Sequence, residues 1–521
     1  MKSIFLIFAT ILILTTHSAH AQDDFDWREI DRAGTLIDKN LRVADNLWKN
    51  YTQAQAVAII KRIPNITKSP AYTELARRFL LTSDTVSNES IDAPLLLAAR
   101  LEKLIALGLI NDAEALLNSV KHPDNYELAQ IKTQQKLLTD SLSSVCLDIQ
   151  ASSMNYRDMP AWRELGDFCK LRFDSGEKIK MGSMAFNNFP DLQKLLSQPD
   201  QIKLQNLNDN FSTFIAFNDG IITDEVYNRD ARQLDSVTNL SIKIATKQEY
   251  AKQETYSCYI IEAANRGLIT EETIEAAYKG KEFSETQLSN TSGRINLHPC
   301  DIPAYFYQRL NKNAGQDNIN QFIDIAVRSG GKIPAQAFIP FRDIFQSYKG
   351  DDDYTKWRIA NILGANGNQI PSSWTVTKPL IALQKNESLN QNEYLEWLKS
   401  RNNDFLSSIG INDPAEILYF SQALNSNKGN FKLNLDKYDY ENLFSLTYGK
   451  KSLVLGLGFN DYIESQYENN NHTNVITSIL YVAGKSDVRD LSPNDLGVII
   501  SGLKAYKLEK NAISLVLEYL Q

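Results

Sequence analysis

Few side chains in this sequence have the types and spacing that catalysis or nucleotide binding requires. Gly484-Lys485-Ser486 has the form of the end of a phosphate-binding loop, but Ile479 stands where that loop needs its first glycine. Ser175 and Lys178 have the S-x-x-K spacing of penicillin-recognising enzymes, yet no K-T-G partner occurs. Neither G-x-S-x-G nor H-E-x-x-H is present, and the histidines after residue 21 are His122, His298 and His472. We therefore identify no catalytic residue and expect no cofactor.

Acidic residues are the next candidates, because carboxylates bind hard cations and can act in pairs as acid and base. Asp351–Asp353 form one run, while Asp436 and Asp439 lie around Tyr438 and Tyr440. Neither group has the alternating oxygen ligands, turn glycine and closing glutamate of a calcium loop. We expect both groups to lie in solvated loops and expect no metal site.

Five aromatic residues between positions 354 and 397 could line a sugar-binding groove: Tyr354, Trp357, Trp374, Tyr394 and Trp397. Glu393 and Glu396 are close in sequence and could supply an acid. Aromatic residues at helical spacing are more often part of a hydrophobic core. Both interpretations stay open at the level of the sequence, and the core is favoured.

The first 21 residues have the form of an export signal. Lys2 is their only charge, the apolar run Ile4–Leu14 is too short to span a bilayer, and Ala19 and Ala21 suit a signal peptidase. We predict cleavage before Gln22, which has no neighbouring cysteine for a lipid anchor. The protein is then periplasmic or secreted; an uncleaved anchor is the alternative.

Four cysteines follow the leader: Cys146, Cys169, Cys258 and Cys300. In an oxidising compartment thiols tend to pair, and three pairings are possible. We favour Cys146 with Cys169 and Cys258 with Cys300, because the first pair lies on successive predicted helices about equally far from the turn around Tyr156. Four buried free thiols are the alternative. A metal centre is disfavoured, since there is no C-x-x-C and only His298 lies near a cysteine.

Composition excludes several classes of protein. Apolar residues make up 43% of the 521 residues and charged residues 23%, which is typical of a globular chain rather than a disordered one. The formal net charge is −8, with both signs interspersed, so neither nucleic acid nor an anionic membrane surface is an expected partner. No later segment is long and apolar enough to span a membrane.

Apolar residues recur at helical spacing in most of the chain, which predicts an all-α fold. Predicted helices cover residues 53–62, 71–81, 93–107, 112–120, 126–139, 160–173, 247–265, 271–279, 301–311, 319–328, 354–363, 393–399, 414–424, 475–482, 493–505 and 510–520. The polar stretch 279–299 predicts an irregular linker between two helical-hairpin regions, 22–278 and 300–521.

Two predicted hairpins share the pattern L-x-A-x-x-L-x-x-x-A-x-x-L. The matching residues are Leu104, Ala106, Leu109, Ala113 and Leu116 in the first hairpin and Leu503, Ala505, Leu508, Ala512 and Leu515 in the second. Small alanines let two helices approach, and each leucine fills the groove between them. Asn111 with Glu114, and Ser492 before Pro493, predict the starts of the second helix and of the last hairpin.

Gly108, Ala113 and Leu117 resemble the turn glycine, packing alanine and large apolar residue of a tetratricopeptide-like repeat. The resemblance covers about one hairpin, and the rest of the chain lacks a regular 34-residue period. It implies an irregular α-solenoid; two ordinary helical bundles are the alternative. The chain is also similar, at the level of fold, to uncharacterised exported helical proteins of proteobacteria and to the superhelical part of soluble lytic transglycosylases.

These observations favour a noncatalytic exported binding or scaffold protein of the bacterial envelope, because solenoids present long concave surfaces to partners. The expected partner is a protein or another envelope component. The alternative is a cell-wall-acting enzyme of the lytic transglycosylase type, which the second resemblance implies. Such an enzyme needs a glutamate in an aromatic cleft, and no segment clearly matches that motif.

Overall fold

The computed structural model describes residues 31–520 apart from a set of gaps. The gaps are residues 37, 39–40, 85, 87–94, 121–124, 139, 175–185, 199–206, 219–230, 248–255, 290–296, 314, 329–332, 391–392, 395, 398–399, 402–404, 406–413, 426–458, 470, 485 and 506–507. The described residues form 23 α-helices and no β-strand, so the predicted all-α class is confirmed.

The helices follow one another along the whole chain. The first group is α3 (Gln53–Arg62), α4 (Pro70–Leu81), α5 (Leu96–Ala106), α6 (Ile110–Asn118), α7 (Tyr126–Lys136), α8 (Leu142–Asn155), α9 (Pro160–Asp174), α10 (Pro190–Ser197) and α11 (Asn210–Asn218). The second is α12 (Asn239–Ala245), α13 (Tyr256–Asn265), α14 (Glu271–Gly280), α15 (Glu285–Leu288), α16 (Ile302–Lys312), α17 (Gln316–Arg328), α18 (Arg342–Gln346), α19 (Asp353–Ala365) and α20 (Lys378–Gln384). The last is α23 (Pro414–Asn425), α25 (Phe459–Glu468), α26 (His472–Val482), α27 (Pro493–Ala505) and α28 (Glu509–Tyr519). Short 3₁₀ turns are η5 (Ala231–Ser236), η6 (Pro299–Asp301), η7 (Ala335–Phe341), η8 (Thr375–Thr377) and η10 (Val488–Asp490).

Most of the longer helices are predicted by the sequence. The bounds of α3 and α27 agree with the prediction, and most others differ by a few residues. The predicted ranges lack several helices, among them the amphipathic α10 and α25. Two further helices outside those ranges, α11 and α12, are buried on nearly every side, from Phe211 to Phe217 and from Asn239 to Ala245 with Lys243 as the exception. A helix buried all round has no polar face, so it gives no 3.6-residue alternation to detect.

A disulfide closes the hairpin of α8 and α9. Cys146 and Cys169 are bonded with their Cα atoms 5.4 Å apart, in the pairing that the sequence favours. Helix α8 ends at Asn155 with Tyr156 as its C-cap, α9 begins at Pro160, and the buried Trp162 packs against Tyr156 with ring centroids 5.4 Å apart. On the chain-entropy model a loop of this length stabilises the fold by about 3 kcal/mol.

The two hairpins that share a sequence pattern also share a turn. In α5–α6 the amide of Leu109 donates to the carbonyl of Leu104 at 2.9 Å, and in α27–α28 Leu508 donates to Leu503 at 2.9 Å. Ser492 caps α27, since its Oγ accepts from the Asp495 amide at 3.1 Å, as predicted.

The cap predicted at the start of the second helix is wrong. Helix α6 begins at Ile110, and Leu109 at its N-cap position makes no side-chain cap hydrogen bond. Asn111, expected to cap a helix starting at residue 112, therefore lies inside the first turn. The reason is the tight connection: residue 109 both completes the C-terminal turn of α5 and enters α6, which leaves no residue for a separate capping box.

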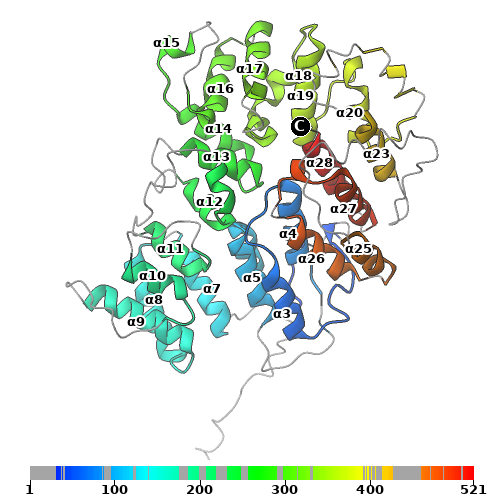
Figure 1. Ribbon diagram of the computed structural model, residues 1–521. Helices are drawn as coiled ribbons and strands as arrows, with labels where there is room; N and C mark the ends of the chain where they lie inside the picture. The colour runs from blue at the N-terminus through cyan, green and yellow to red at the C-terminus, as the bar shows by residue number, and fades with distance from the viewer. Residues whose placement is uncertain are drawn as a thin grey trace, which may run out of the picture.

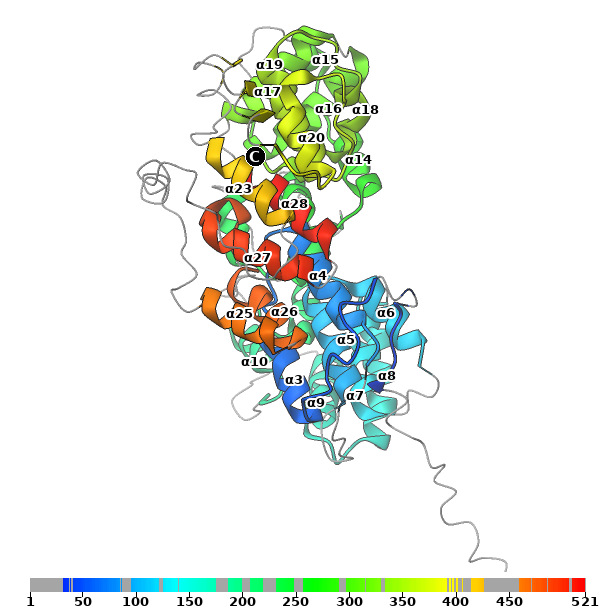
Figure 2. The same ribbon diagram turned by 90° about the vertical axis from the view of Figure 1, so that its right-hand side faces the viewer.

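The molecule is elongated, with α14–α20 at one end and α3, α7, α8 and α9 at the other (Figures 1 and 2). Between them the last helices pack on early ones: α26 and α28 both contact α4. Hydrogen bonds cross this contact, from Tyr51 Oη to Asn474 Oδ1 at 2.8 Å and from Asn511 Nδ2 to the Ala71 carbonyl at 3.0 Å. The two ends of the described chain thus build one common centre.

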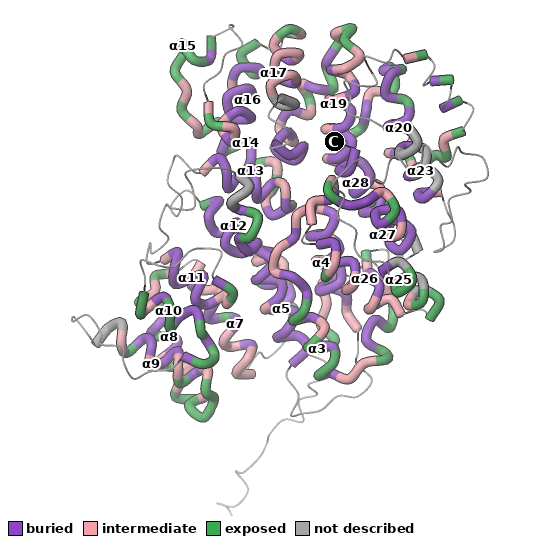
Figure 3. The backbone as a smooth tube through the Cα atoms, viewed as in Figure 1, coloured by how far each residue is buried: buried purple, intermediate pink, exposed green. Residues whose placement is uncertain are grey.

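Buried apolar side chains from Leu36 to Leu520 form one continuous core, and exposed residues gather at outer loops and helix ends (Figure 3). The division into 22–278, 279–299 and 300–521 stays a prediction. Helix α15 lies inside the stretch expected to be irregular, and the Cys258–Cys300 disulfide joins residues on its two sides.

Candidate functional site

The α5–α6 hairpin positions the largest hollow that we describe. Gly108 ends α5 with φ of +73°, a left-handed conformation that glycine adopts without steric cost. Its amide donates to the Ile105 carbonyl at 2.8 Å. This turn sets α6 against α5 with Ala113, Leu116 and Leu117 as its buried face. The rest of α6 faces outward and forms one wall of a groove.

This α6–α12 groove has a volume of about 650 Å³ and is built from four helices. It is lined by Ile110, Asn111, Glu114, Leu117, Asn118 and Val120 of α6 and its end, Lys132, Gln135, Lys136 and Leu138 around α7, Lys243, Ile244, Thr246 and Lys247 around α12, and Thr273 of α14. The volume lies within the roughly 300–1,000 Å³ typical of ligand sites.

Lysines dominate the charge of the groove, with four lysines against a single carboxylate, Glu114. Lys243 Nζ donates to the Leu268 carbonyl at 2.7 Å, Lys247 Nζ donates to the Leu138 carbonyl at 3.0 Å, and Lys136 pairs with Asp148. Burial, with a further contribution from Lys247, lowers the pKa of Lys243. Lys132 is exposed and makes no ion pair or side-chain hydrogen bond in the described part of the chain. The groove is therefore a cationic surface with one uncommitted ammonium group.

The floor of the groove is apolar, because Leu117 is only 6% exposed and Ile244 is 1% exposed. Beside them the side-chain amide nitrogen of Gln135 is buried and has no hydrogen-bond partner. A buried donor without an acceptor costs free energy that an acceptor on a ligand would recover. Cationic rim, apolar floor and free amide together fit a ligand that carries carboxylates and apolar side chains.

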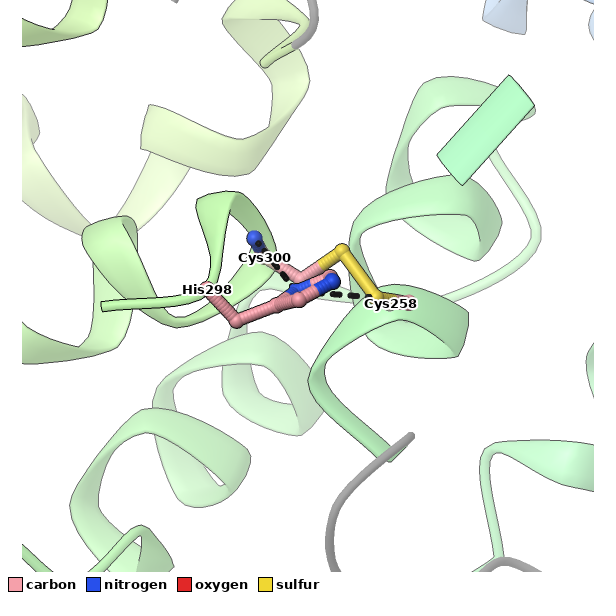
Figure 4. Close-up of side chains that lie close together, drawn as sticks. All are labelled: Cys258, His298 and Cys300. Atoms are coloured by element: carbon pink, nitrogen blue, oxygen red, sulfur yellow. Dashed lines mark hydrogen bonds between the residues drawn. A yellow bond between two sulfur atoms is a disulfide. The ribbon is translucent and has the colours of Figure 1, made fainter. Parts of the chain in front are cut away.

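The cysteine and histidine cluster has a structural geometry. Cys258 of α13 and Cys300 of η6 form the second disulfide, and His298 Nδ1 lies 3.7 Å from Cys258 Sγ (Figure 4). The same nitrogen accepts from the Cys300 amide at 3.3 Å and so caps η6. The ligand atoms of the three residues lie within 4.8 Å of one another, a spacing that could hold a metal ion. In the disulfide, however, neither sulfur is the thiolate that zinc or copper takes.

The aromatic residues proposed as a sugar groove lie in the core. Trp357 is fully buried and stacks on Trp397 at 5.7 Å, and Trp397 stacks on Tyr394 at 5.6 Å. Glu393 and Glu396 are exposed, whereas Tyr394 and Trp397 beside them are buried. The favoured interpretation as core is confirmed for Trp357, Trp374, Tyr394 and Trp397, and Tyr354 is half-buried against that core.

The acidic run is a helix start. Asp352 accepts from the Thr355 amide at 2.9 Å as the N-cap of α19, and Asp353 pairs with Arg401 at 3.0 Å. Gly484 follows the end of α26, where its carbonyl accepts from the Lys68 amide at 3.1 Å, so it has no place at a helix N-terminus. Burial lowers the pKa of His472 at the start of α26.

Several predicted features lie outside the described residues. They are the leader 1–21 with its cleavage site at Gln22, His122, the pair Ser175 and Lys178, Lys485, and the group Asp436, Tyr438, Asp439 and Tyr440. The groove was missed for another reason. Its one sequence signal is lysine at i and i+4 in two short segments, at 132 and 136 and at 243 and 247, and nothing in the sequence places those segments together.

Comparisons with known proteins do not assign the chain to a family. No protein-family model, no curated protein and no solved structure matches it. The tetratricopeptide-like resemblance is thus limited to the form of a helical hairpin. Among the described residues, no helix combines the length and the apolar character needed to cross a membrane.

Proposed function

We propose that this chain is an exported, noncatalytic binding protein of the cell envelope, and that its α6–α12 groove holds an acidic, partly apolar segment of a partner protein. The observation that carries the proposal is the combination of four lysines, an apolar floor and an unpartnered buried amide in one groove of about 650 Å³. Lysines contribute chiefly to attraction and orientation, while the apolar floor supplies affinity.

Two further features support this role. The two disulfides suit an oxidising compartment such as the periplasm or the extracellular space. Consecutive helices pair as hairpins in α5–α6, α8–α9 and α27–α28, which is the building unit of an irregular α-solenoid. The cell-wall enzyme has less support, because the aromatic rings that would form its cleft are packed in the core.

The test uses peptides of matched length in which leucine alternates with aspartate, serine or lysine. Binding to the full, disulfide-bonded chain is measured by fluorescence anisotropy at low and at moderate salt. We expect the aspartate peptide to bind most tightly and to weaken with salt, because Debye screening reduces attraction between exposed charges. Equal binding of the three peptides, or no binding of the aspartate peptide, contradicts the proposal.

A charge reversal locates the binding. Lys132→Glu replaces the uncommitted ammonium group of the groove and should weaken the aspartate peptide about tenfold. Lys312→Glu is the matched control, because Lys312 at the end of α16 is also exposed, lies outside the groove, and makes no ion pair or side-chain hydrogen bond within the part of the chain that the structure describes. If the two variants bind the peptide alike, the groove is not the site.

A further inference from the structure

A second cavity lies on the other side of α7 from the groove, and its lining is polar. It has a volume of about 280 Å³. Six of its residues carry carboxamides, two carry carboxylates, two are lysines and four are apolar: Asn65, Gln130, Gln134, Asn188, Asn208, Asn210; Glu102, Asp209; Lys61, Lys103; Ala99, Ala106, Phe189 and Phe211. Such a lining differs sharply from the apolar floor of the α6–α12 groove.

Helix geometry explains how the residues converge. Ala99, Glu102, Lys103 and Ala106 share one face of α5, because residues three and four apart are neighbours on a helix. The two alanines are small and leave space on either side of Glu102. Gln130 and Gln134 come from one face of α7. The remaining lining comes from the end of α3, from the residues just before α10, and from the start of α11, where Asp209 Oδ1 accepts from the Ser212 amide at 2.7 Å.

Part of the lining serves as scaffold. Lys103 Nζ donates to the Ile63 carbonyl and to Asn65 Oδ1, both at 2.6 Å, and so ties α5 to the end of α3. Asn210 Nδ2 donates to the Glu102 carbonyl at 3.1 Å. These bonds hold the walls in place. They use the donors of Lys103, which also reaches the Lys61 carbonyl at 3.3 Å, and one of the two N–H groups of Asn210.

Three acceptors have no partner. Gln134 is 4% exposed, and its side-chain carbonyl oxygen has no hydrogen bond. Asp209 Oδ2 is likewise buried and unpartnered. The carboxylate of Glu102 makes no hydrogen bond or ion pair with any residue that the structure describes. Buried acceptors without donors are rare in folded proteins, so a ligand that donates hydrogen bonds would satisfy this cavity.

From this arrangement we infer that the cavity is a binding site for a small, neutral, hydroxyl-rich molecule of the size of one sugar ring. The hydroxyl groups donate to Gln134, Asp209 and Glu102. Formal charges in the lining cancel, since Lys61 and Lys103 offset the two carboxylates, so a cationic ligand gains little. An anion would face three acceptors. The volume, near the lower limit of about 300 Å³ for ligand sites, admits one ring rather than a chain.

Electrostatics agree with an unfilled acceptor site. Burial raises the pKa of Asp209 to about 6, with a further contribution from Asp191, and burial also raises the pKa of Glu102. Both shifts reflect the removal of these carboxylates from water, although Asp209 keeps a hydrogen bond from Ser212 and the charge of Lys61 favours the ionised form of Glu102. Hydroxyl groups of a ligand would supply further donors.

Calorimetric titration of the full, disulfide-bonded chain tests the inference. Glucose and N-acetylglucosamine are the neutral probes, and propylammonium and acetate are the charged ones. We expect at least one neutral probe to bind and neither charged probe to compete. Binding of propylammonium alone, of acetate alone, or of no probe overturns the inference.

Variants assign the site. Glu102→Gln removes the half-buried carboxylate, and Gln134→Leu removes the buried carbonyl; each should weaken the neutral probe about tenfold. Glu114→Gln in the α6–α12 groove is the matched control and should leave the affinity for the neutral probe unchanged.

Because Gln134 is buried, the affinity of Gln134→Leu is interpreted only if its melting curve matches that of the wild type. The result for Glu102→Gln does not depend on this condition. Unchanged affinity in Glu102→Gln overturns the assignment. Binding of the aspartate peptide should be unaffected in Glu102→Gln, so this test is separate from that of the proposed function.

Discussion

The hairpins α5–α6 and α27–α28 carry the same five-residue pattern at the same spacing, and both make the same hydrogen bond across the turn. Ala113 and Leu116 in α6 are fully buried, and so are their counterparts Ala512 and Leu515 in α28. The face that joins the two helices of each hairpin is thus alike. Their outer faces differ, because that of α6 is exposed in the groove and that of α28 is buried at the centre of the molecule.

Helix α28 is covered on its outer face. It packs against α4, α19, α20 and α23, and its buried residues include Leu517 and Glu518. The equivalent positions in α6 are Asn118 and Ser119, and both are exposed. Leu517 packs so closely on Gly364 of α19 that a Cβ on that glycine would lie 3.2 Å from the leucine Cδ1. The same local motif therefore forms a groove wall in α6 and a buried central helix in α28.

Exchanging the residues at the equivalent positions 118 and 517 should give the largest effect on the free energy of unfolding. Leu517→Asn removes a buried side chain and buries an amide without partners, which should lower the free energy of unfolding by about 4 kcal/mol. The reverse exchange, Asn118→Leu, changes an exposed site and should stay within about 0.5 kcal/mol. Urea denaturation of both variants checks this. Similar losses in the two would mean that α6 and α28 do not differ as described.

The buried Glu518 of α28 should make the stability of the fold depend on pH, with a smaller effect than the exchange at position 517. Burial, reinforced by Asp487, raises the pKa of Glu518 from 4.5 to about 8, so the folded state holds this proton more tightly than the unfolded chain does. Its contribution to stability is complete below about pH 4.5 and declines as the pH rises to about 8, by at most about 1.4 kcal/mol for each pH unit.

The variant Glu518→Gln should remove that decline, so it should exceed the wild type in melting temperature at pH 8 and approach it near pH 4.5. Melting temperatures measured across this range check the sign. Glu114→Gln, an exposed glutamate of α6, is the matched charge removal and should follow the wild type. If the melting temperature of the wild type instead rises above that of Glu518→Gln as the pH increases, the prediction is wrong.

The turn glycine of α5–α6 predicts the smallest effect. Gly108 and Gly367 both have φ near +70°, but a Cβ on Gly108 would lie 3.0 Å from the Asn239 carbonyl oxygen, whereas a Cβ on Gly367 would meet nothing within 4 Å. Gly367→Ala should cost about 1 kcal/mol for the left-handed backbone alone, and Gly108→Ala about 1 kcal/mol more for the close contact. Thermal unfolding of the two variants compares them. Equal costs would show that α12 gives way to the added methyl group.

Sequence reasoning predicted what depends on neighbours along the chain. The all-α class, the amphipathic helices α3 and α27, the Ser492 cap and the turns after Leu104 and Leu503 all follow from local periodicity and capping chemistry. The favoured cysteine pairing also agrees with the structure, because Cys146 and Cys169 flank a turn that the sequence itself marks. In α11 and α12 the same reasoning failed, since helices buried on nearly all sides lack the polar face on which periodicity depends.

Tertiary structure alone decided the environment of each helix. Nothing in the pattern L-x-A-x-x-L-x-x-x-A-x-x-L separates α6 from α28, because it records only the packing of a helix on its own partner. Which other helices pack against a hairpin depends on contacts between residues hundreds of positions apart, such as Asn511 with Ala71. The lysines of the groove and the free acceptors of the polar cavity are brought together in the same way. Local sequence therefore determined the helices and their turns, whereas packing against distant segments determined which helix faces are buried and which are exposed.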